Sequence, residues 1–149
     1  MSVFKDKYCK KHLTLELIDE LYKWKNKRNQ LIHDLIKSNY ENFDIKKVAE
    51  EGYELVKKFN GKTTLVNKHL DNINKDKNKI YSDLMSKLKK SMSNEFYYEA
   101  IFIEFAILED RTSSLLKHAN KEYDDLTLNK KYGKLKVCLS LKINIVRNI

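Results

Sequence analysis

The stretch Trp24-Lys25-Asn26-Lys27-Arg28-Asn29-Gln30-Leu31-Ile32-His33-Asp34-Leu35 decides how the first part of this 149-residue chain folds. Around it, apolar residues return at three- and four-residue steps: Leu17, Ile18, Leu21, Trp24, Leu31, Ile32 and Leu35. That spacing predicts an amphipathic helix from Leu15 onward. Arg28 falls on the apolar stripe, four residues after Trp24 and three before Leu31. A cation at that place is either held by a buried acid or turned toward a partner subunit.

His33 follows Arg28 by five residues, which places the two side chains about 140° apart around an ideal helix. They do not stack, and they converge only if Arg28 bends round or the helix is locally distorted. The sector between them carries Lys25, Asn29, Ile32 and Ile36. Asn29 and His33 do face each other, four residues apart, so the Asn29 amide can orient the imidazole.

The composition favours an all-α protein. The chain has no proline and three glycines, so capping and polar residues must end most of its helices. A length of 149 residues suits one compact domain. We expect residues 1–149 to form a single bundle of about five helices.

Further helices are expected along the chain. After a polar break at residues 37–42, Asp44 is the expected cap of a helix whose apolar stripe runs to Phe59. Asn60-Gly61 is a stop signal, so Thr63 or Thr64 would open a third helix. Residues 74–79 continue that helix or form a loop before an apolar pattern at 80–88, and residues 87–94 have the composition of a linker.

The most hydrophobic pattern lies at residues 94–121, and a helix there should be central in the core. Four aromatic residues recur in it at helical spacing, which favours burial over a base-stacking platform: Tyr97, Tyr98, Phe102 and Phe105. After an irregular stretch to Gly133, the last segment reads as a helix, although residues 141–145 also alternate as in a strand.

The net charge of +9 favours a polyanionic partner such as RNA, DNA or an anionic membrane surface. A composition rich in Lys, Asn and Ile, typical of AT-rich genomes, is the alternative explanation. Cys9 and Cys138 show neither a disulfide pattern nor metal-ligand spacing, which fits a reducing cytosol. The sequence has no membrane-length apolar run and no signal-peptide core, so we expect a cytoplasmic protein without metal or cofactor.

The segment Arg28-Asn29-Gln30-Leu31-Ile32-His33 resembles the R-x(4–6)-H signature of HEPN domains. These are small all-helical domains, many of them metal-independent ribonucleases. The resemblance implies a HEPN-like bundle, RNA as substrate, and a homodimer whose composite site joins two Arg/His pairs. It also raises the prospect of a toxin or phage-defence effector with an antitoxin or other regulatory partner.

The order of the elements departs from that family. In HEPN-like chains the signature helix follows a long hydrophobic helix, whereas here it precedes residues 94–121. We therefore hypothesise a circular permutation whose native order begins near Met92. Residues 1–90 would then carry the signature helix and those after it, and residues 91–149 the hydrophobic helix and the last one.

The chemistry of metal-independent RNA cleavage gives these residues roles. His33 can move a proton at the 2′-hydroxyl or the leaving oxygen, and Arg28 can stabilise charge on the phosphate. The resemblance thus implies a catalytic group of Arg28, Asn29 and His33. We expect substrate binding by Lys25, Lys27 and Arg111, with Glu104 in a supporting role beside Arg28.

Each assignment has a structural alternative. Arg28 could pair with Glu104, and His33 could be a surface histidine bonded to Asp34. The protein would then be a non-catalytic RNA- or protein-binding module, or a helical interaction module whose charge has no function. Leu35 also stands where HEPN toxins often carry a tyrosine that an antitoxin modifies, so any antitoxin would have to act differently.

Overall fold

Helix α2 spans Leu15–Ile36 and confirms the helix predicted around Arg28. Thr14 caps its first turn, because its side-chain oxygen accepts a hydrogen bond from the backbone N–H of Leu17 at 3.3 Å. The buried side chains of α2 are Lys25 and five members of the predicted apolar stripe, while Ile32 and Leu35 of that stripe are half-buried. The indole N–H of Trp24 donates to the carbonyl oxygen of Val48 at 2.9 Å and so anchors α2 to the next helix.

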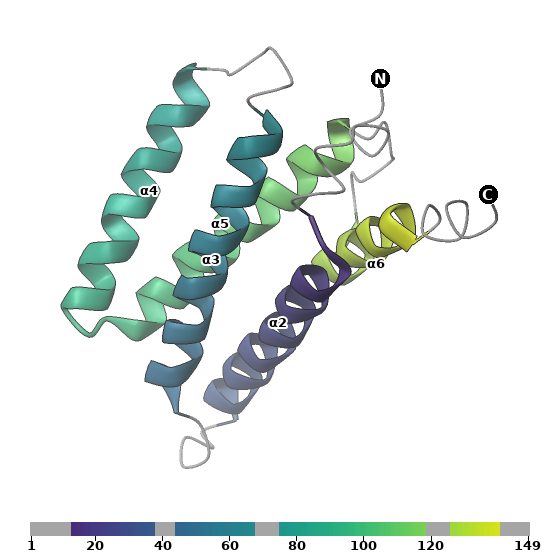
Figure 1. Ribbon diagram of the computed structural model, residues 1–149. Helices are drawn as coiled ribbons and strands as arrows, with labels where there is room; N and C mark the ends of the chain where they lie inside the picture. The colour runs from purple at the N-terminus through teal and green to yellow at the C-terminus, as the bar shows by residue number, and fades with distance from the viewer. Residues whose placement is uncertain (1–12, 38–43, 68–74, 119–125, 141–149) are drawn as a thin grey trace, which may run out of the picture.

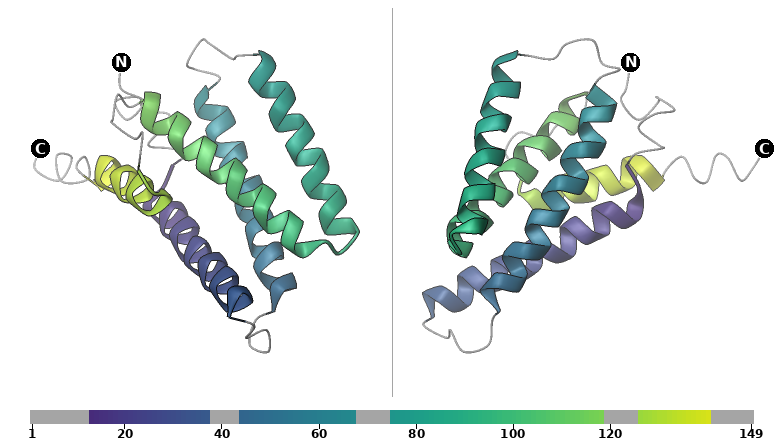
Figure 2. Two further views of the ribbon diagram at one scale, coloured as in Figure 1. Left: turned by 180° about the vertical axis from the view of Figure 1, so that it is seen from behind. Right: turned by 60° about the vertical axis from the view of Figure 1, so that its left-hand side comes forward.

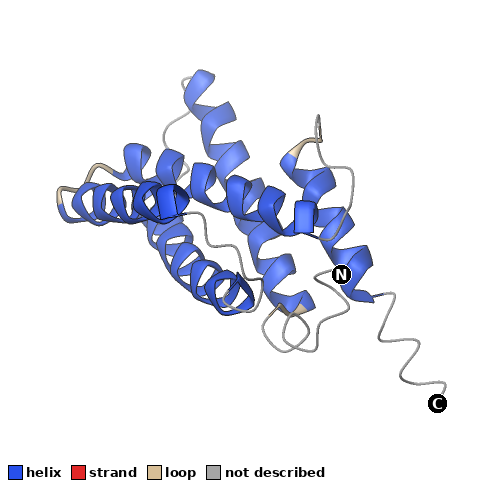
Figure 3. Ribbon diagram, turned by 90° about the horizontal axis from the view of Figure 1, so that it is seen from above, coloured by secondary structure: helices blue, strands red, loops and turns tan. Residues whose placement is uncertain are grey.

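The computed structural model describes residues 13–37, 44–67, 75–118 and 126–140, and each regular element within them is a helix (Figure 3). The helices after α2 are α3 at Ile45–Asn67, α4 at Lys75–Ser93, α5 at Tyr97–His118 and α6 at Leu128–Ser140. The all-α expectation is therefore confirmed.

Helices α3 and α5 cross in the middle of the bundle (Figure 1). Helix α4 packs along α5 and also meets α3, while α2 and α6 lie on the other side (Figure 2). Helix α6 contacts both α2 and α5. This arrangement makes α5 central, as its hydrophobic sequence predicts.

One hydrophobic core joins the described helices. Its largest fully buried side chains include Trp24 from α2, Phe59 from α3, Leu88 from α4 and Tyr132 from α6. Helices α2, α3 and α5 come close together at Gly52 of α3, which has no side chain to separate α3 from Trp24 and from Glu104 of α5. The crossing of α2, α3 and α5 thus depends on this glycine.

Two predicted helix boundaries are wrong. Helix α3 continues through Asn60-Gly61 to Asn67, so the third helix predicted from Thr63 or Thr64 belongs to α3. Thr63 is buried, and its hydroxyl donates to the carbonyl oxygens of Phe59 and Asn60 at 3.0 Å. Burial of this face outweighs the roughly 1 kcal/mol that one helical glycine costs.

The linker predicted at residues 87–94 is also wrong, because α4 continues to Ser93. Leu88 and Ser91 of this segment are buried, and the Ser91 hydroxyl donates to Glu99 of α5 at 2.9 Å. The chain reverses over only a few residues, with Glu95 in a left-handed conformation at φ 60°. Similarly, Gly133 lies inside α6, where an irregular stretch was expected.

The predicted cap of α3 is confirmed. The Asp44 side chain caps α3 by accepting a hydrogen bond from the backbone N–H of Lys47 at 3.0 Å. Residues 75–79 begin α4, so neither expectation for residues 74–79, a continuation of the preceding helix or a loop, holds for them. The predictions for residues 68–74 and for the segment beyond residue 140 lie outside the described residues. The hypothesis of a circular permutation depends on both ends of the chain, which also lie outside them.

Replacement of Gly52 by alanine should destabilise the fold by about 1–3 kcal/mol, because the core has no space for a methyl group. The added Cβ would lie 2.7 Å from two carbon atoms of Trp24 and closer still to the Glu104 carboxyl group. Gly61 and Gly133 have nothing within 4 Å of such a Cβ, so Gly61→Ala and Gly133→Ala should stabilise their helices by about 0.5–1 kcal/mol. Denaturant unfolding measures all three, and equal effects would contradict this packing.

Candidate functional site

The guanidinium group of Arg28 reaches from α2 across to two aromatic rings of α5. Its central carbon lies 4.1 Å from the ring centroid of Phe105 and 5.5 Å from that of Phe102. One terminal nitrogen donates to the side-chain oxygen of Asn29 at 3.2 Å, and the Nε atom is buried without a partner. Stacking on aromatic rings holds the cation in one orientation at the edge of the bundle.

Arg28 and Lys25 form a pair of cations that no described carboxylate contacts within ion-pair distance. Lys25 donates to the side-chain oxygen of Asn26 at 3.3 Å, so each cation bonds a neutral amide. Among the described residues neither one makes an ion pair within 4 Å. Burial and the charge of Arg28 lower the pKa of Lys25, and burial lowers that of Arg28 despite the opposing effect of Glu109. An anion placed here would relieve both effects.

Lys27 lies on a different side of α2. Its ammonium group pairs with Glu51 of α3 at 2.6 Å, away from the rings that Arg28 contacts. The three basic residues predicted to act together on α2 are therefore divided between two faces.

Asn29 and His33 are exposed on α2. Because α2 is helical throughout this region, Lys25, Asn29 and His33 form one row at steps of four residues, with Arg28 beside it. The Asn29 oxygen accepts from Arg28, and no described side chain hydrogen-bonds the imidazole of His33. Asp34 bonds Gln30 instead, at 2.9 Å. Within one chain the structure brings Arg28 to Asn29 but records no contact between Arg28 and His33.

Arg111 stacks on Tyr81 of α4, with 3.6 Å between the guanidinium carbon and the ring centroid. Burial lowers its pKa, and Tyr81 bonds the neighbouring Asp110. Its recorded contacts are therefore with α4, whereas those of Arg28 lie between α2 and α5. His118 stands seven residues after Arg111 in the sequence, but its side chain is outside the described part of the chain.

Glu104 is fully buried, at 0% exposure, and neither carboxyl oxygen has a hydrogen-bond partner among the described residues. The ion pair considered between Glu104 and Arg28 therefore does not form. Burial raises the pKa of Glu104 to about 9, so the group is a neutral acid at pH 7. The Glu104 carboxyl group lies in the core against Gly52 and Trp24, and not in a groove beside Arg28.

Stability should fall with pH because of Glu104. The folded state holds its proton up to about pH 9, whereas the unfolded chain releases it near 4.5. The stabilising effect is complete below that lower value and is lost as the pH rises toward the folded pKa, with a slope of at most about 1.4 kcal/mol per pH unit. We expect Glu104→Gln, which cannot ionise, to become progressively more stable than the wild type between pH 5 and pH 9.

Urea unfolding of both proteins at several pH values measures that difference directly. The comparison cancels the titration of all other groups, because the two chains differ at one position only. Parallel stability curves would show that Glu104 ionises equally in both states.

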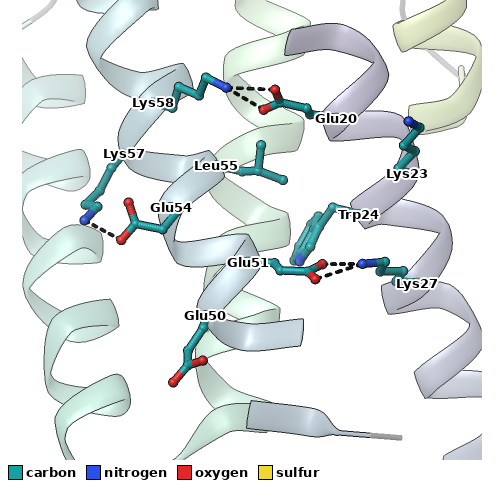
Figure 4. Close-up of a pocket in the computed structure, with 10 residues that line it drawn as sticks. All are labelled: Glu20, Lys23, Trp24, Lys27, Glu50, Glu51, Glu54, Leu55, Lys57 and Lys58. Carbon is teal, nitrogen blue, oxygen red and sulfur yellow. Dashed lines mark hydrogen bonds and ion pairs between the residues drawn. The ribbon is translucent and has the colours of Figure 1, made fainter. Parts of the chain in front are cut away.

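A groove of about 920 Å³ lies between α2 and α3, apart from the Arg28 face (Figure 4). Trp24 and Leu55 lie at its floor, and two ion pairs cross it: Lys27 with Glu51, and Lys58 with Glu20, each at 2.6 Å. Its walls carry four acidic side chains and four lysines, so its charge is balanced. Sequence reasoning missed this groove, although acids and lysines recur along both helices beside the apolar stripes.

The expectation that the aromatic residues of α5 are core residues is wrong for two of them. Phe102 is 54% exposed and Tyr98 37%, while Tyr97 and Phe105 are half-buried and pack against the core. Helix α5 is apolar on most of its surface, so helical spacing does not indicate which side faces inward.

Comparison of the chain with protein-family models, with curated proteins and with solved structures finds no match. Within the described residues there is no group of three or more His, Cys, Asp or Glu side chains placed to hold a metal ion. None of the described helices combines the length and the apolar character that a membrane crossing requires.

Proposed function

We propose that this protein is a metal-independent endoribonuclease of the HEPN type that binds RNA on the Arg28 face of α2. The observation that carries the proposal is the cation pair of Arg28 and Lys25, which makes no ion pair within 4 Å among the described residues, beside the exposed Asn29 and His33. A phosphate group supplies the missing negative charge, and the guanidinium is already oriented to receive it.

The reaction uses the ribose itself as nucleophile. His33 accepts the proton of the 2′-hydroxyl while the 2′-oxygen attacks phosphorus, and the bond to the 5′-oxygen breaks as that oxygen takes up a proton. Arg28 stabilises the negative charge that gathers on the phosphate. The products are a 2′,3′-cyclic phosphate and a 5′-hydroxyl end, so DNA, which lacks the nucleophile, is not a substrate.

A homodimer would bring together Arg28 and His33 side chains, which make no contact within one chain. Arg28 bends toward α5 and leaves His33 on the outer row of α2, so a second copy of the helix is needed to complete the site. Two histidines, one from each subunit, can then divide the roles of base and acid. In this proposal the protein acts in the cytoplasm as a toxin or defence effector, controlled by a partner that does not rely on a tyrosine at position 35.

The same separation of Arg28 from His33 favours a second candidate function, a non-catalytic RNA-binding module. Arg28 and Lys25 would hold phosphates as in the first proposal, and His33 would take no part in chemistry. Binding of RNA without cleavage by the wild type would select this function.

Arg28→Ala and His33→Ala should each reduce cleavage of total RNA by about 100-fold or more, with the fold intact, because each removes one partner of the reaction. Gel analysis of purified dimer with total RNA, with and without EDTA, measures this, and activity should survive the chelator. Gln30→Ala is the control, since Gln30 is exposed on the same helix but bonds Asp34. Full cleavage by His33→Ala would exclude the proposed chemistry.

Two lysines on α2 give a matched test of where RNA binds. Lys25→Ala removes an unpaired cation, whereas Lys27→Ala removes one that is already paired with Glu51. We expect Lys25→Ala to weaken RNA binding severalfold and to lower the slope of log affinity against log salt by about 0.7, the value for one phosphate contact on a single strand. Lys27→Ala should leave both nearly unchanged. Equal losses would indicate a diffuse electrostatic surface instead of a site.

A further inference from the structure

Phe102 is a large aromatic residue whose side chain is exposed on the surface of α5. At 54% exposure it cannot contribute fully to the core, yet its neighbour one turn later, Phe105, packs inward. The central carbon of the Arg28 guanidinium lies 5.5 Å from the ring centroid of Phe102 and 4.1 Å from that of Phe105. The arrangement leaves a flat apolar surface open to solvent beside a fixed cation.

We propose that Phe102 and Arg28 form a stacking platform for an unpaired base of single-stranded RNA, next to the phosphate bound by Arg28 and Lys25. This inference rests on the proposed function, because it takes RNA as the ligand. A nucleotide carries a flat ring and a phosphate, and the platform offers an aromatic face and two unpaired cations within one small area. Single-stranded nucleic acids are commonly bound by this combination.

Charge favours RNA as the occupant of Phe102. Within the described residues, neither Lys25 nor Arg28 makes an ion pair with a carboxylate within 4 Å. RNA neutralises the same cations. Base pairing hides the faces of bases inside a duplex, so the platform should select single strands, loops and bulges.

The test compares binding of a labelled single-stranded RNA of about 12 nucleotides, and of its duplex, by fluorescence anisotropy. We expect Phe102→Ala to weaken single-strand binding by about 5- to 150-fold, the loss of one stacked base, with little effect on the duplex. The salt slope should stay as in the wild type, because no charge is removed. Phe102→Trp should restore binding, since a larger ring keeps the stacking face.

Phe96→Ala is the matched control. Phe96 has nearly the same exposure, 58%, but lies just before α5 and makes no recorded contact with Arg28. It should bind single strands like the wild type. Circular dichroism checks that each variant folds, and a half-exposed ring is expected to contribute little to stability.

Several outcomes would overturn the platform. Wild-type binding by Phe102→Ala, or an equal loss for single strand and duplex, would exclude stacking while leaving the proposed ribonuclease intact, provided that Arg28→Ala and His33→Ala still lose cleavage. A shift in sedimentation toward monomer on Phe102→Ala would identify the ring as a subunit contact. Absence of any RNA binding by the wild type would instead remove both the proposed function and this inference.

Discussion

The close packing of Trp24 against Gly52 and Glu104 is the constraint on which the rest of the structure depends. The indole is 1% exposed and bonds the backbone of α3, so it fixes the rotation of α2 about its own axis. Arg28 then lies about 40° from Trp24 around the helix, and Lys27 about 60° to the other side. One anchored side chain therefore directs Arg28 to the rings of α5 and Lys27 to Glu51 of α3.

This anchoring has a cost, because it seals the carboxyl group of Glu104 in the core without a partner. A buried acid in such surroundings is tolerated in its neutral form, and its ionisation opposes folding. The ionisation of Glu104 thus makes the stability of the packing between α2, α3 and α5 depend on pH. The guanidinium of Arg28 is only half-buried and stays charged. The fold therefore keeps the neutral carboxyl group of Glu104 in the core and the charged guanidinium of Arg28 at the edge of the bundle.

The sequence was sufficient to predict most helices and the inward side of α2, since both follow from local periodicity. The ends of helices were harder to predict: Asn60-Gly61 and residues 87–94 look like breaks, but burial of Phe59, Thr63 and Leu88 carries the helices through them. The contacts and the exposure of the site residues were the hardest to predict. That Lys27 is paired, Glu104 isolated and Phe102 exposed depends on which helix lies opposite each one, and local sequence does not contain that information.

Under the proposed function, RNA binds on the face shared by α2 and α5 and not in the groove between α2 and α3, whose charges are balanced. Hydrogen exchange of the protein with and without single-stranded RNA tests that claim most directly. We predict slower exchange in residues 25–36 and 97–106, with residues 46–58 of the groove unchanged. Protection confined to residues 46–58, or no protection at all, would contradict the account.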